Sequence, residues 1–458
     1  MAGRIAYLGN ISPQGLVLDL DAGIKGSYPG VGTTWSDISN NGNNGTLTNG
    51  PTFTGSNYGA IVFDGVNDYV TGSIINTPNQ LSVFCFKNPK PRVGSVYPTI
   101  ISKWTNDAQG QNRSWVVGSI PGGVDYLAIS TDGTYTNSTV KRYEFSSSVS
   151  NNIWTQIGFT FNNGTIVPYL NGAPVNYTAV LNPNITSIHT SSIPYTLGYC
   201  KDGVLDLYYS GSIATAQIYN QALNQFQVWQ NFNAYKSRYG IPDIVTDGLV
   251  LNLDAGNPYS YLSGSSGTTW TNTVAVSSSI SGTLVNGPVY SNGAITFDGV
   301  NDYVNCGDIL NTTGSFSITS WIRIPGNGLY PIVSKWDSSG ANNKRFFLFR
   351  VNTNILQFFD SNTSLTARGT VTANTWTETT VVVDGSNSQL YINGAPAGAT
   401  FNPTLAIKTG VNLGIGCYSY SLDTFFSGNI ANTKIYNRAL TQTEITQNFN
   451  ALRGRYGI

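Results

Sequence analysis

Charged residues are scarce in this 458-residue sequence. Asp, Glu, Lys and Arg make up 10% of it, against about 25% in ordinary globular proteins. The 23 basic residues balance the 23 acidic ones, so the formal net charge is zero. A balanced chain offers neither the basic footprint of a nucleic-acid-binding protein nor a polybasic membrane patch. We therefore expect no nucleic-acid partner and no membrane partner.

Histidine and glutamate are nearly absent, which excludes several kinds of active site. The single histidine, His189, stands in "NITSIHTSS" without a GxSxG motif, so we expect neither a Ser-His-Asp triad nor a histidine-rich zinc site. The glutamates are Glu144, Glu378 and Glu444, and the first two lie in different halves. Glycoside hydrolysis needs a close pair of carboxylates, which aspartates alone would have to supply. We expect a protein that is not an enzyme.

Cysteine and long apolar runs are also rare. Cys85, Cys200, Cys306 and Cys417 are far apart, so no CxxC metal or redox motif exists. Each half holds two of them, and a disulfide in each half is the alternative to free thiols. No run approaches roughly 18 apolar residues, and the start, "MAGRIAYLGN", lacks the apolar core of a signal peptide. We expect folding in a reducing cytoplasm without a signal peptide.

Glycine and short β-type patterns are abundant. The sequence holds 50 glycines, as many tight turns require. In "LVLDLDAG", Leu16, Leu18 and Leu20 alternate with other residues, which predicts a half-buried strand. "FSITSWIRI" alternates in the same way, and "TTVVVDGSNSQLYING" predicts a strand, a turn and a strand. Many short strands with regular turns indicate a sandwich or jelly roll.

The sequence is one unit written twice. The octapeptide "FDGVNDYV" occurs at 63–70 and again at 297–304, and both copies end in "RYGI". Its flanks predict a hairpin, with Gly65 in the turn and four anchors, Phe63, Val66, Tyr69 and Val70. Repeats longer than about 200 residues indicate duplicated domains, since solenoids repeat every 20–50 residues. The predicted parts are an N-terminal arm (1–14), a first domain (15–241), a linker (242–247) and a second domain (248–458).

One short helix closes each copy. In the second copy, Thr441 and Glu444 form a capping box, and Ile445, Phe449 and Leu452 share one apolar face. The same positions in the first copy are held by Asn224, Gln227, Val228, Phe232 and Tyr235. We expect both helices to pack on the sheets through these faces.

These landmarks resemble the laminin-G-like branch of the concanavalin A-like lectin and glucanase superfamily. The resemblance rests on the ordered segments "FDGVNDYV", "FSITSWIRI", "NTWTETTVVV", "LYINGAP", "LGIG" and "GNIANTKIYNRALTQTEI", and it covers nearly the whole chain twice. The first copy departs at "LSVFCFKNP", where Cys85 falls near Ser320 and Phe86 near Trp321. The resemblance implies an all-β fold of two tandem antiparallel jelly-roll sandwiches. The two glutamates flanking an aspartate that superfamily glucanases use have no match here.

The N-terminal third contains, in order, "MAGRIAYLGN", "GLVLDLDAG", "YPG" and "GTTWSDISNNGNNGTLTNGPTF". With these segments it also resembles a group of tailed-phage virion proteins that carry such domains. This resemblance implies a non-enzymatic structural protein on the virion surface, as capsid decoration or as a tail or fibre component, synthesised in the host cytoplasm. The arm would contact other virion proteins, and the lectin-like domains would bind cell-surface glycans. The alternatives are a carbohydrate-active enzyme, secreted or phage-borne, and a cement protein without a ligand. The composition equally fits a β-rich extracellular protein.

Two sets of residues are candidates for binding. Calcium takes 6–8 oxygen ligands, which aspartates recurring in both copies would supply, although aspartate beside glycine also suits tight turns. Glycans bind on aromatic platforms, although aromatic side chains also pack within sheets. The candidate calcium ligands are Asp21, Asp64, Asp68, Asp254, Asp298 and Asp302. The candidate glycan-binding residues are Tyr97, Trp104, Tyr208, Tyr209, Tyr330, Trp336, Tyr418 and Tyr420.

Overall fold

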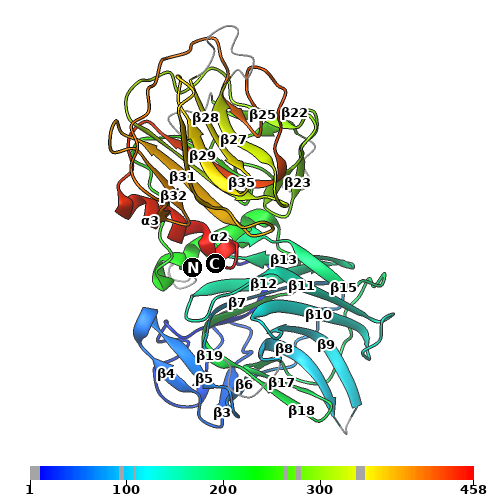
Figure 1. The fold of residues 1–458 in the computed structure, drawn as a ribbon. Helices are drawn as coiled ribbons and strands as arrows, with labels where there is room; N and C mark the ends of the chain where they lie inside the picture. Colours follow the sequence, from blue (N-terminus) through cyan, green and yellow to red (C-terminus); the bar gives the residue numbers. More distant parts are fainter. Residues whose placement is uncertain (1–10, 92–96, 108–109, 263–266, 275–279, 337–345) are drawn as a thin grey trace. The chain divides into compact units, whose positions relative to one another are not determined.

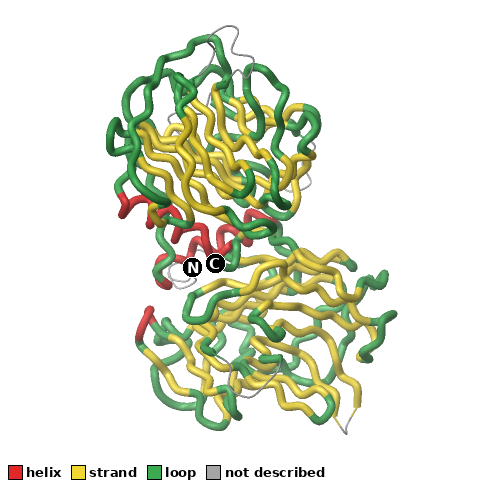
Figure 2. The backbone as a smooth tube through the Cα atoms, in the orientation of Figure 1, coloured by secondary structure: helices red, strands yellow, loops and turns green. Residues whose placement is uncertain are grey.

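The structure is a computed structural model that describes residues 11–91, 97–107, 110–262, 267–274, 280–336 and 346–458 (Figure 1). The chain divides into two compact units. Unit 1 comprises Met1–Ile241 together with Arg453–Ile458, and unit 2 comprises Pro242–Leu452. Strands dominate both units (Figure 2). Within the described residues, no helix has the length and apolar character needed to cross a membrane.

Unit 1 is a sandwich of two sheets. Its 8-stranded sheet, sheet A, has the order β14-β13-β12-β7-β19-β5-β4, with β1 also paired to β19. Its 11-stranded sheet, sheet B, has the order β15-β11-β10-β9-β8-β16-β6-β3-β2, with β17 joining β8 and β18. The strands of sheet A are β1 (Leu16–Asp21), β4 (Thr52–Thr54), β5 (Ala60–Asp64), β7 (Gln80–Pro89), β12 (Thr155–Asn162), β13 (Thr165–Leu170), β14 (Ala173–Pro174) and β19 (Ser210–Tyr219). The strands of sheet B are β2 (Thr34–Trp35), β3 (Gly45–Thr48), β6 (Tyr69–Thr71), β8 (Thr99–Asp107), β9 (Gly110–Ser119), β10 (Val124–Gly133), β11 (Val140–Ser148), β15 (Tyr177–Leu181), β16 (Thr196–Leu197), β17 (Tyr199–Asp202) and β18 (Leu205–Tyr208).

Unit 2 repeats this architecture with two 8-stranded sheets. Sheet C has the order β23-β24-β35-β26-β31-β32-β33, with β20 paired to β35, and sheet D has the order β21-β22-β25-β34-β27-β28-β29-β30. The strands of sheet C are β20 (Leu249–Asp254), β23 (Val289–Ser291), β24 (Ala294–Asp298), β26 (Phe316–Arg323), β31 (Thr377–Val383), β32 (Gln389–Ile392), β33 (Ala395–Pro396) and β35 (Ser427–Tyr436). The strands of sheet D are β21 (Thr269–Trp270), β22 (Gly282–Val285), β25 (Tyr303–Asn305), β27 (Leu329–Lys335), β28 (Phe347–Asn352), β29 (Ile355–Phe359), β30 (Leu365–Thr370) and β34 (Gly414–Ile415). The predicted pair of antiparallel jelly rolls is confirmed.

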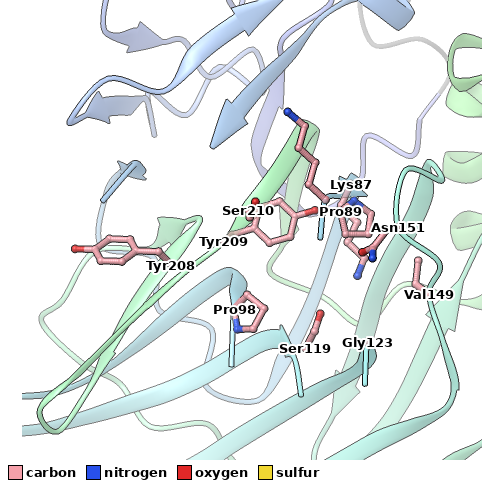
Figure 3. A pocket seen from close by; sticks show the side chains of 11 residues that line it. Lys87, Pro89, Pro98, Ser119, Gly123, Val149, Asn151, Tyr208, Tyr209 and Ser210 are labelled. Atoms are coloured by element: carbon pink, nitrogen blue, oxygen red, sulfur yellow. The ribbon is translucent and has the colours of Figure 1, made fainter. Parts of the chain in front are cut away.

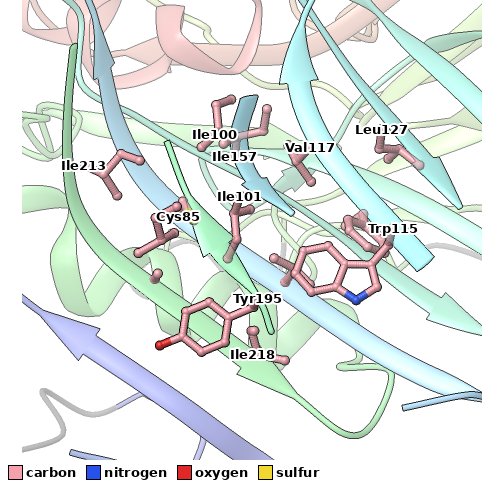
Figure 4. Close-up of a cluster of buried hydrophobic side chains, with 14 of the residues drawn as sticks. Cys85, Ile100, Ile101, Trp115, Val117, Leu127, Ile157, Tyr195, Ile213 and Ile218 are labelled. Atoms are coloured by element: carbon pink, nitrogen blue, oxygen red, sulfur yellow. The ribbon is translucent and has the colours of Figure 1, made fainter. Parts of the chain in front are cut away.

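A hydrophobic core fills the space between the two sheets of each unit. In unit 1, Cys85 from sheet A and Trp115 and Leu127 from sheet B are at most 2% exposed and belong to one cluster (Figure 4). Alternate residues of each strand point into this cluster, as a pleated strand requires. All four cysteines are buried and free, so the disulfide alternative is not seen.

Strand β1 departs from the predicted half-buried pattern. Leu18 and Leu20 face the core, but Asp19 and Asp21 on the opposite side are also 0% exposed. Arg238 covers this side, and its guanidinium contacts both carboxylate oxygens of Asp21 at 2.6 Å. Both faces are therefore buried, which the alternation of Leu with Asp did not indicate.

The two predicted helices are present and cover the outer faces of sheets A and C. Helix α2 (Gln225–Tyr235) begins with the predicted capping box, since the side chains of Asn224 and Gln227 each accept a backbone N–H. Helix α3 (Gln442–Leu452) is capped in the same way by Thr441 and Glu444. The rings of Trp321 and Phe449 stack at 5.7 Å, and Phe86 and Phe232 stack in the equivalent place at 6.2 Å. Short 3-10 turns follow at η2 (Lys236–Tyr239) and η4 (Arg453–Arg455), and a third, η1 (Ser56–Tyr58), precedes β5.

Residues 1–10 of the predicted arm lie outside the described residues, whereas its end packs on unit 1. Ile11 is buried against helix α2, and the N–H of Ser12 donates to Asn231 Oδ1 at 2.7 Å. In unit 2, the N–H of Val245 in the linker donates in the same way to Asn448 Oδ1 at 2.8 Å. The two segments therefore play equivalent structural roles.

Candidate functional site

The octapeptide 63–70 joins the two sheets of unit 1. Strand β5 ends at Asp64 in sheet A and β6 begins at Tyr69 in sheet B, so the predicted hairpin is wrong. Phe63 and Val70 point into the shared core, whereas Val66 is 58% exposed. Apolar residues on both sides of a turn do not indicate whether the two flanking strands pair in one sheet or face each other across the core.

The aspartates of the octapeptide bind backbone donors. Asp64 Oδ1 accepts the N–H groups of Val66 and Asn67 at 2.7 and 3.3 Å, and Asp68 Oδ2 accepts the N–H of Asp64 at 3.1 Å. Burial opposes ionisation of Asp64, but these backbone bonds lower its pKa below the ordinary value. Asp298 and Asp302 make the same bonds in unit 2.

The remaining predicted calcium ligands do not join this set. Asp21 forms the ion pair with Arg238, and Asp254 Oδ1 accepts the N–H of Gly256 at 3.0 Å. Among the described residues, no three His, Cys, Asp or Glu side chains gather in a group that would hold a metal ion. Calcium binding stays a prediction, and local backbone bonds or the arginine account for the observed positions of these aspartates.

Two predicted glycan-binding residues, Tyr97 and Trp104, line a pocket of about 210 Å³ on the outer face of sheet B. Residues of β9, β10 and β11 alternate here: Val117, Leu127 and Tyr143 face the core, whereas their neighbours form the pocket face. The pocket residues are Tyr97, Trp104, Val116, Tyr126, Ala128, Tyr135, Arg142, Cys200, Asp202, Leu205 and Leu207.

Two arginines organise the pocket wall. Arg142 lies over the rings of Tyr126 and Tyr97 at 5.0 and 5.9 Å and pairs with Glu144 at 2.7 Å. Such contacts between a cation and an aromatic ring hold the ring in place.

Arg113 holds two further aromatic residues of the pocket in place, Trp104 and Tyr135. It lies 5.8 Å from the centroids of both rings and pairs with Asp202 at 2.6 Å. Burial raises the pKa of the Tyr126 hydroxyl well above its ordinary value and that of the Cys200 thiol to about 12, so both stay neutral. Neither arginine is predictable from the sequence, since nothing local links them to the aromatic residues.

The equivalent place in unit 2 is filled. Strand register matches Ala128 to Phe359, because they pair with Val116 and Leu348 respectively. Gly198 and Gly416 donate to the equivalent carbonyls of Ile100 and Ile332, so Cys200 two residues later matches Tyr418. By the same register Gly118 matches Arg350, which lies 4.5 Å from the centroid of Phe359 and hydrogen-bonds to the hydroxyl of Tyr418. Three small residues of unit 1 therefore leave a space that three large residues fill in unit 2. The small residues are Gly118, Ala128 and Cys200, and their large counterparts are Arg350, Phe359 and Tyr418.

Tyr97 and Tyr330 are not structural equivalents, although each precedes a proline. Between this proline and "SKW" the first copy has one residue more than the second. A shift of one residue moves a strand side chain to the other face. Tyr97 therefore faces the pocket, whereas Tyr330 lies in the core against Phe426.

The other predicted aromatic residues are dispersed. Tyr209 is 1% exposed in the core, so it and Tyr330 do not form surface platforms. Trp336 and Tyr418 are each 6% exposed and pack together with Leu348. Tyr208 is half-buried and stacks on Tyr199 at 4.8 Å. Tyr420 is 41% exposed.

A second, smaller hollow of about 30 Å³ is lined by Lys87, Ser119 and Tyr209 (Figure 3), and Lys87 forms a buried ion pair with Asp125. Lys87 Nζ lies 2.6 and 2.7 Å from the oxygens of Asp125, and these side chains are 1% and 0% exposed. Ser119 Oγ donates to Asp125 Oδ1 at 2.6 Å. Tyr209 also lines the hollow, and its buried hydroxyl has no partner among the described residues. Figure 3 shows Tyr208, the last residue of β18, and Tyr209, which follows it, pointing away from each other.

Unit 2 has apolar residues at all four of these positions. Register and shared backbone bonds match Lys87, Asp125, Ser119 and Tyr209 to Ile322, Leu356, Val351 and Phe426. All four replacements belong to the core cluster of unit 2. The fold therefore forms without the ion pair, which is a distinguishing feature of unit 1.

The pocket on sheet B combines apolar depth, aromatic walls and a few polar groups, as sites for small polar ligands do. The antiparallel sandwich that occurs twice defines the class of the chain, a tandem β-sandwich protein. The family description "Concanavalin A-like lectin/glucanases superfamily" matches residues 64–229 and 298–446. The chain belongs to this superfamily. No curated protein matches the sequence.

Solved structures of similar fold include proteins that act on or bind carbohydrates. Domain 4 of AbnA, an extracellular arabinanase from Geobacillus stearothermophilus, in complex with arabinotriose, is 16% identical with a TM-score of 0.33, covering 47% of this chain and 97% of that one. Trypanosoma rangeli sialidase in complex with sialic acid is 12% identical, with a TM-score of 0.37 and coverages of 92% and 68%. The binding domain of Paraclostridial Mosquitocidal Protein 1 is 13% identical, with a TM-score of 0.37 and coverages of 90% and 92%. At these scores the likenesses carry no functional argument.

Proposed function

We propose that unit 1 is a non-enzymatic carbohydrate-binding domain and that the pocket on sheet B holds one sugar residue of a glycan. The observation that supports this proposal is the pocket itself, with Trp104 and Tyr97 beside Arg142 and Asp202. Aromatic faces pack against the C–H groups of a sugar ring, while the charged side chains exchange hydrogen bonds with its hydroxyls. A volume of about 210 Å³ suits one ring rather than a chain of them.

The pocket favours binding over hydrolysis. Asp202 is the one carboxylate among the described residues that line it, and this carboxylate is paired with Arg113. Glycoside hydrolysis requires two carboxyl groups on either side of the scissile bond. Incubation with polysaccharides that the protein binds should therefore release no reducing ends, and measurable cleavage would contradict this part of the proposal.

A glycan array with the full-length chain tests binding, and the duplicated fold supplies the variant. Ala128→Phe places in unit 1 the residue that unit 2 already accommodates as Phe359, so it should fill the pocket and leave the fold intact. Val180→Phe, on the exposed edge strand β15, is the matched control. Saturable binding by the wild type and the control, lost in Ala128→Phe, is expected. Equal binding by all three proteins would refute the site.

We further propose that the protein is displayed on the surface of a tailed-phage particle, as capsid decoration or as part of a tail or fibre. The low charge, the zero net charge and the resemblance of the N-terminal third support this placement. Residues 1–14 would contact the neighbouring virion proteins. Mass spectrometry of purified particles is the test: hundreds of copies indicate capsid decoration, and a few indicate a tail. Protein found free in infected cells but absent from particles contradicts the proposal.

A further inference from the structure

We propose that the pocket of unit 1 selects a sugar bearing an acetamido group, with the methyl on the pocket floor and the carbonyl oxygen bound by Arg142. This inference rests on the proposed carbohydrate-binding function and specifies the ligand of that site. It follows from three features of the pocket: an apolar floor, an incompletely bonded arginine at its wall, and charges that are already balanced.

The floor offers nothing for a hydroxyl to bond. Val116, Ala128 and Leu207 are at most 5% exposed, and their side chains carry no hydrogen-bonding atoms. The Cys200 thiol is already bonded to Thr99 Oγ1 at 3.1 Å. A sugar hydroxyl placed here would lose its bonds to water without replacement, whereas a methyl group gains from leaving water.

Arg142 has a donor to spare. Its two terminal nitrogens donate to Tyr135 Oη at 3.3 Å and to Glu144 Oε1 at 2.7 Å. Its buried Nε–H has no acceptor among the described residues. Each terminal nitrogen carries two N–H groups and uses one of them in these bonds. A carbonyl oxygen that enters the pocket beside Arg142 can accept one of the remaining N–H groups.

The charges of the wall argue against an anionic group in the same place. Arg142 is paired with Glu144 and Arg113 with Asp202, so both cations are already neutralised by carboxylates. A carboxylate or sulfate would also meet the charge of Asp202 on the pocket wall. A neutral group that carries a methyl group next to a hydrogen-bond acceptor fits best. In the acetamido group, the methyl group and the carbonyl oxygen are attached to the same carbon.

Isothermal titration of the full-length chain tests the inference with N-acetylglucosamine and N-acetylgalactosamine, their parent hexoses, the corresponding amino sugars and a 6-deoxyhexose. One buried methyl and one bond to a charged donor predict at least about tenfold tighter binding of the N-acetylated sugars. Arg142→Lys keeps the charge opposite Glu144 but removes the guanidinium donors, so it should lower the ratio of N-acetylated-sugar affinity to parent-hexose affinity, whatever it does to hexose binding itself. Val180→Phe should retain it.

The outcomes separate the two proposals. If no sugar or glycan binds, the carbohydrate-binding function fails. If hexoses bind and Ala128→Phe prevents it, but the N-acetylated and parent sugars bind equally, the function stands and the acetamido inference is wrong. Equal binding of the 6-deoxyhexose and the N-acetylated sugars refutes the role of the carbonyl. Thermal melting of each variant confirms that it is folded.

Discussion

Replacing Asp19 with asparagine should stabilise unit 1 at neutral and alkaline pH. Asp19 is 0% exposed on strand β1; Oδ1 accepts Gln217 Nε2 at 2.9 Å, and buried Oδ2 has no partner among the described residues. Unit 2 has Asn252 at the equivalent position, where Nδ2 donates to Thr273 Oγ1 at 2.7 Å. The same fold therefore accepts the neutral side chain.

The magnitude follows from the pKa of this carboxyl group. Burial, with smaller contributions from the charges of Asp21 and Asp37, raises the pKa of Asp19 from 3.8 to about 7. Below pH 3.8 the group is protonated in both states and costs nothing. Between these two pKa values the unfolded chain loses its proton first, so stability falls as pH rises. Above pH 7 the penalty is complete, at about 4 kcal/mol.

Asp19→Asn removes this titration. The gain in the free energy of unfolding of unit 1 should be near zero at pH 4 and approach about 4 kcal/mol at pH 8, less any unmade bonds of the amide. Differential scanning calorimetry of the full-length chain at several pH values measures it, with the transition of unit 1 assigned by the variant. The reciprocal change, Asn252→Asp, is the control and should lower the stability of unit 2 as pH rises.

The reasoning would be refuted by a gain that does not change between pH 4 and pH 8. Such a result would mean that Asp19 is ionised at the same pH in the folded and unfolded chain. A loss of stability at pH 8 would be equally contradictory, because it would show that the carboxylate is better solvated or paired than the structure indicates.

Three further predictions concern unit 1. Lys87→Met should lower the free energy of unfolding by about 3–5 kcal/mol because it leaves Asp125 charged and buried, whereas the double change to Ile and Leu, as in unit 2, should be neutral or stabilising in the same denaturation assay. Gly65 has φ 81°, so Gly65→Val should cost about 1–2 kcal/mol, with or without calcium in the melting buffer. Asp64→Asn combined with Asp68→Asn should lower the melting temperature by weakening the backbone bonds; an unchanged stability together with loss of a calcium-dependent shift would instead establish a metal site.

The sequence predicted best what depends on neighbours along the chain. The capping boxes at Asn224 and Thr441 and the apolar faces of both helices are confirmed, because caps and helical periodicity involve residues three or four positions apart. The duplicated jelly roll is confirmed for a similar reason, since many landmarks in fixed order leave few alternative folds.

Prediction failed where the outcome depends on distant strands. The octapeptide shows the same turn in either topology, so its crossing between sheets was read as a hairpin. Tyr97 and Tyr330 were both expected to bind glycans, but the spacing from each to "SKW" differs by one residue, and a difference of one residue places their side chains on opposite faces of the sheet. Arg113 and Arg142 reach the aromatic residues only after β9 and β11 join sheet B.

In unit 2 the place equivalent to the sheet B pocket is filled by Arg350, Phe359 and Tyr418, which limits how firmly one chain would attach to a surface that displays the ligand. A chain that presents the sheet B pocket in one of its two copies is monovalent for that ligand, and a single sugar in a small pocket binds weakly. Firm attachment then depends on many chains arrayed together, because each engaged site raises the effective concentration of the next. If the protein is displayed on a particle as proposed, the strength of attachment would be set by the copy number and spacing of the chains, and release by the fast dissociation of each individual contact.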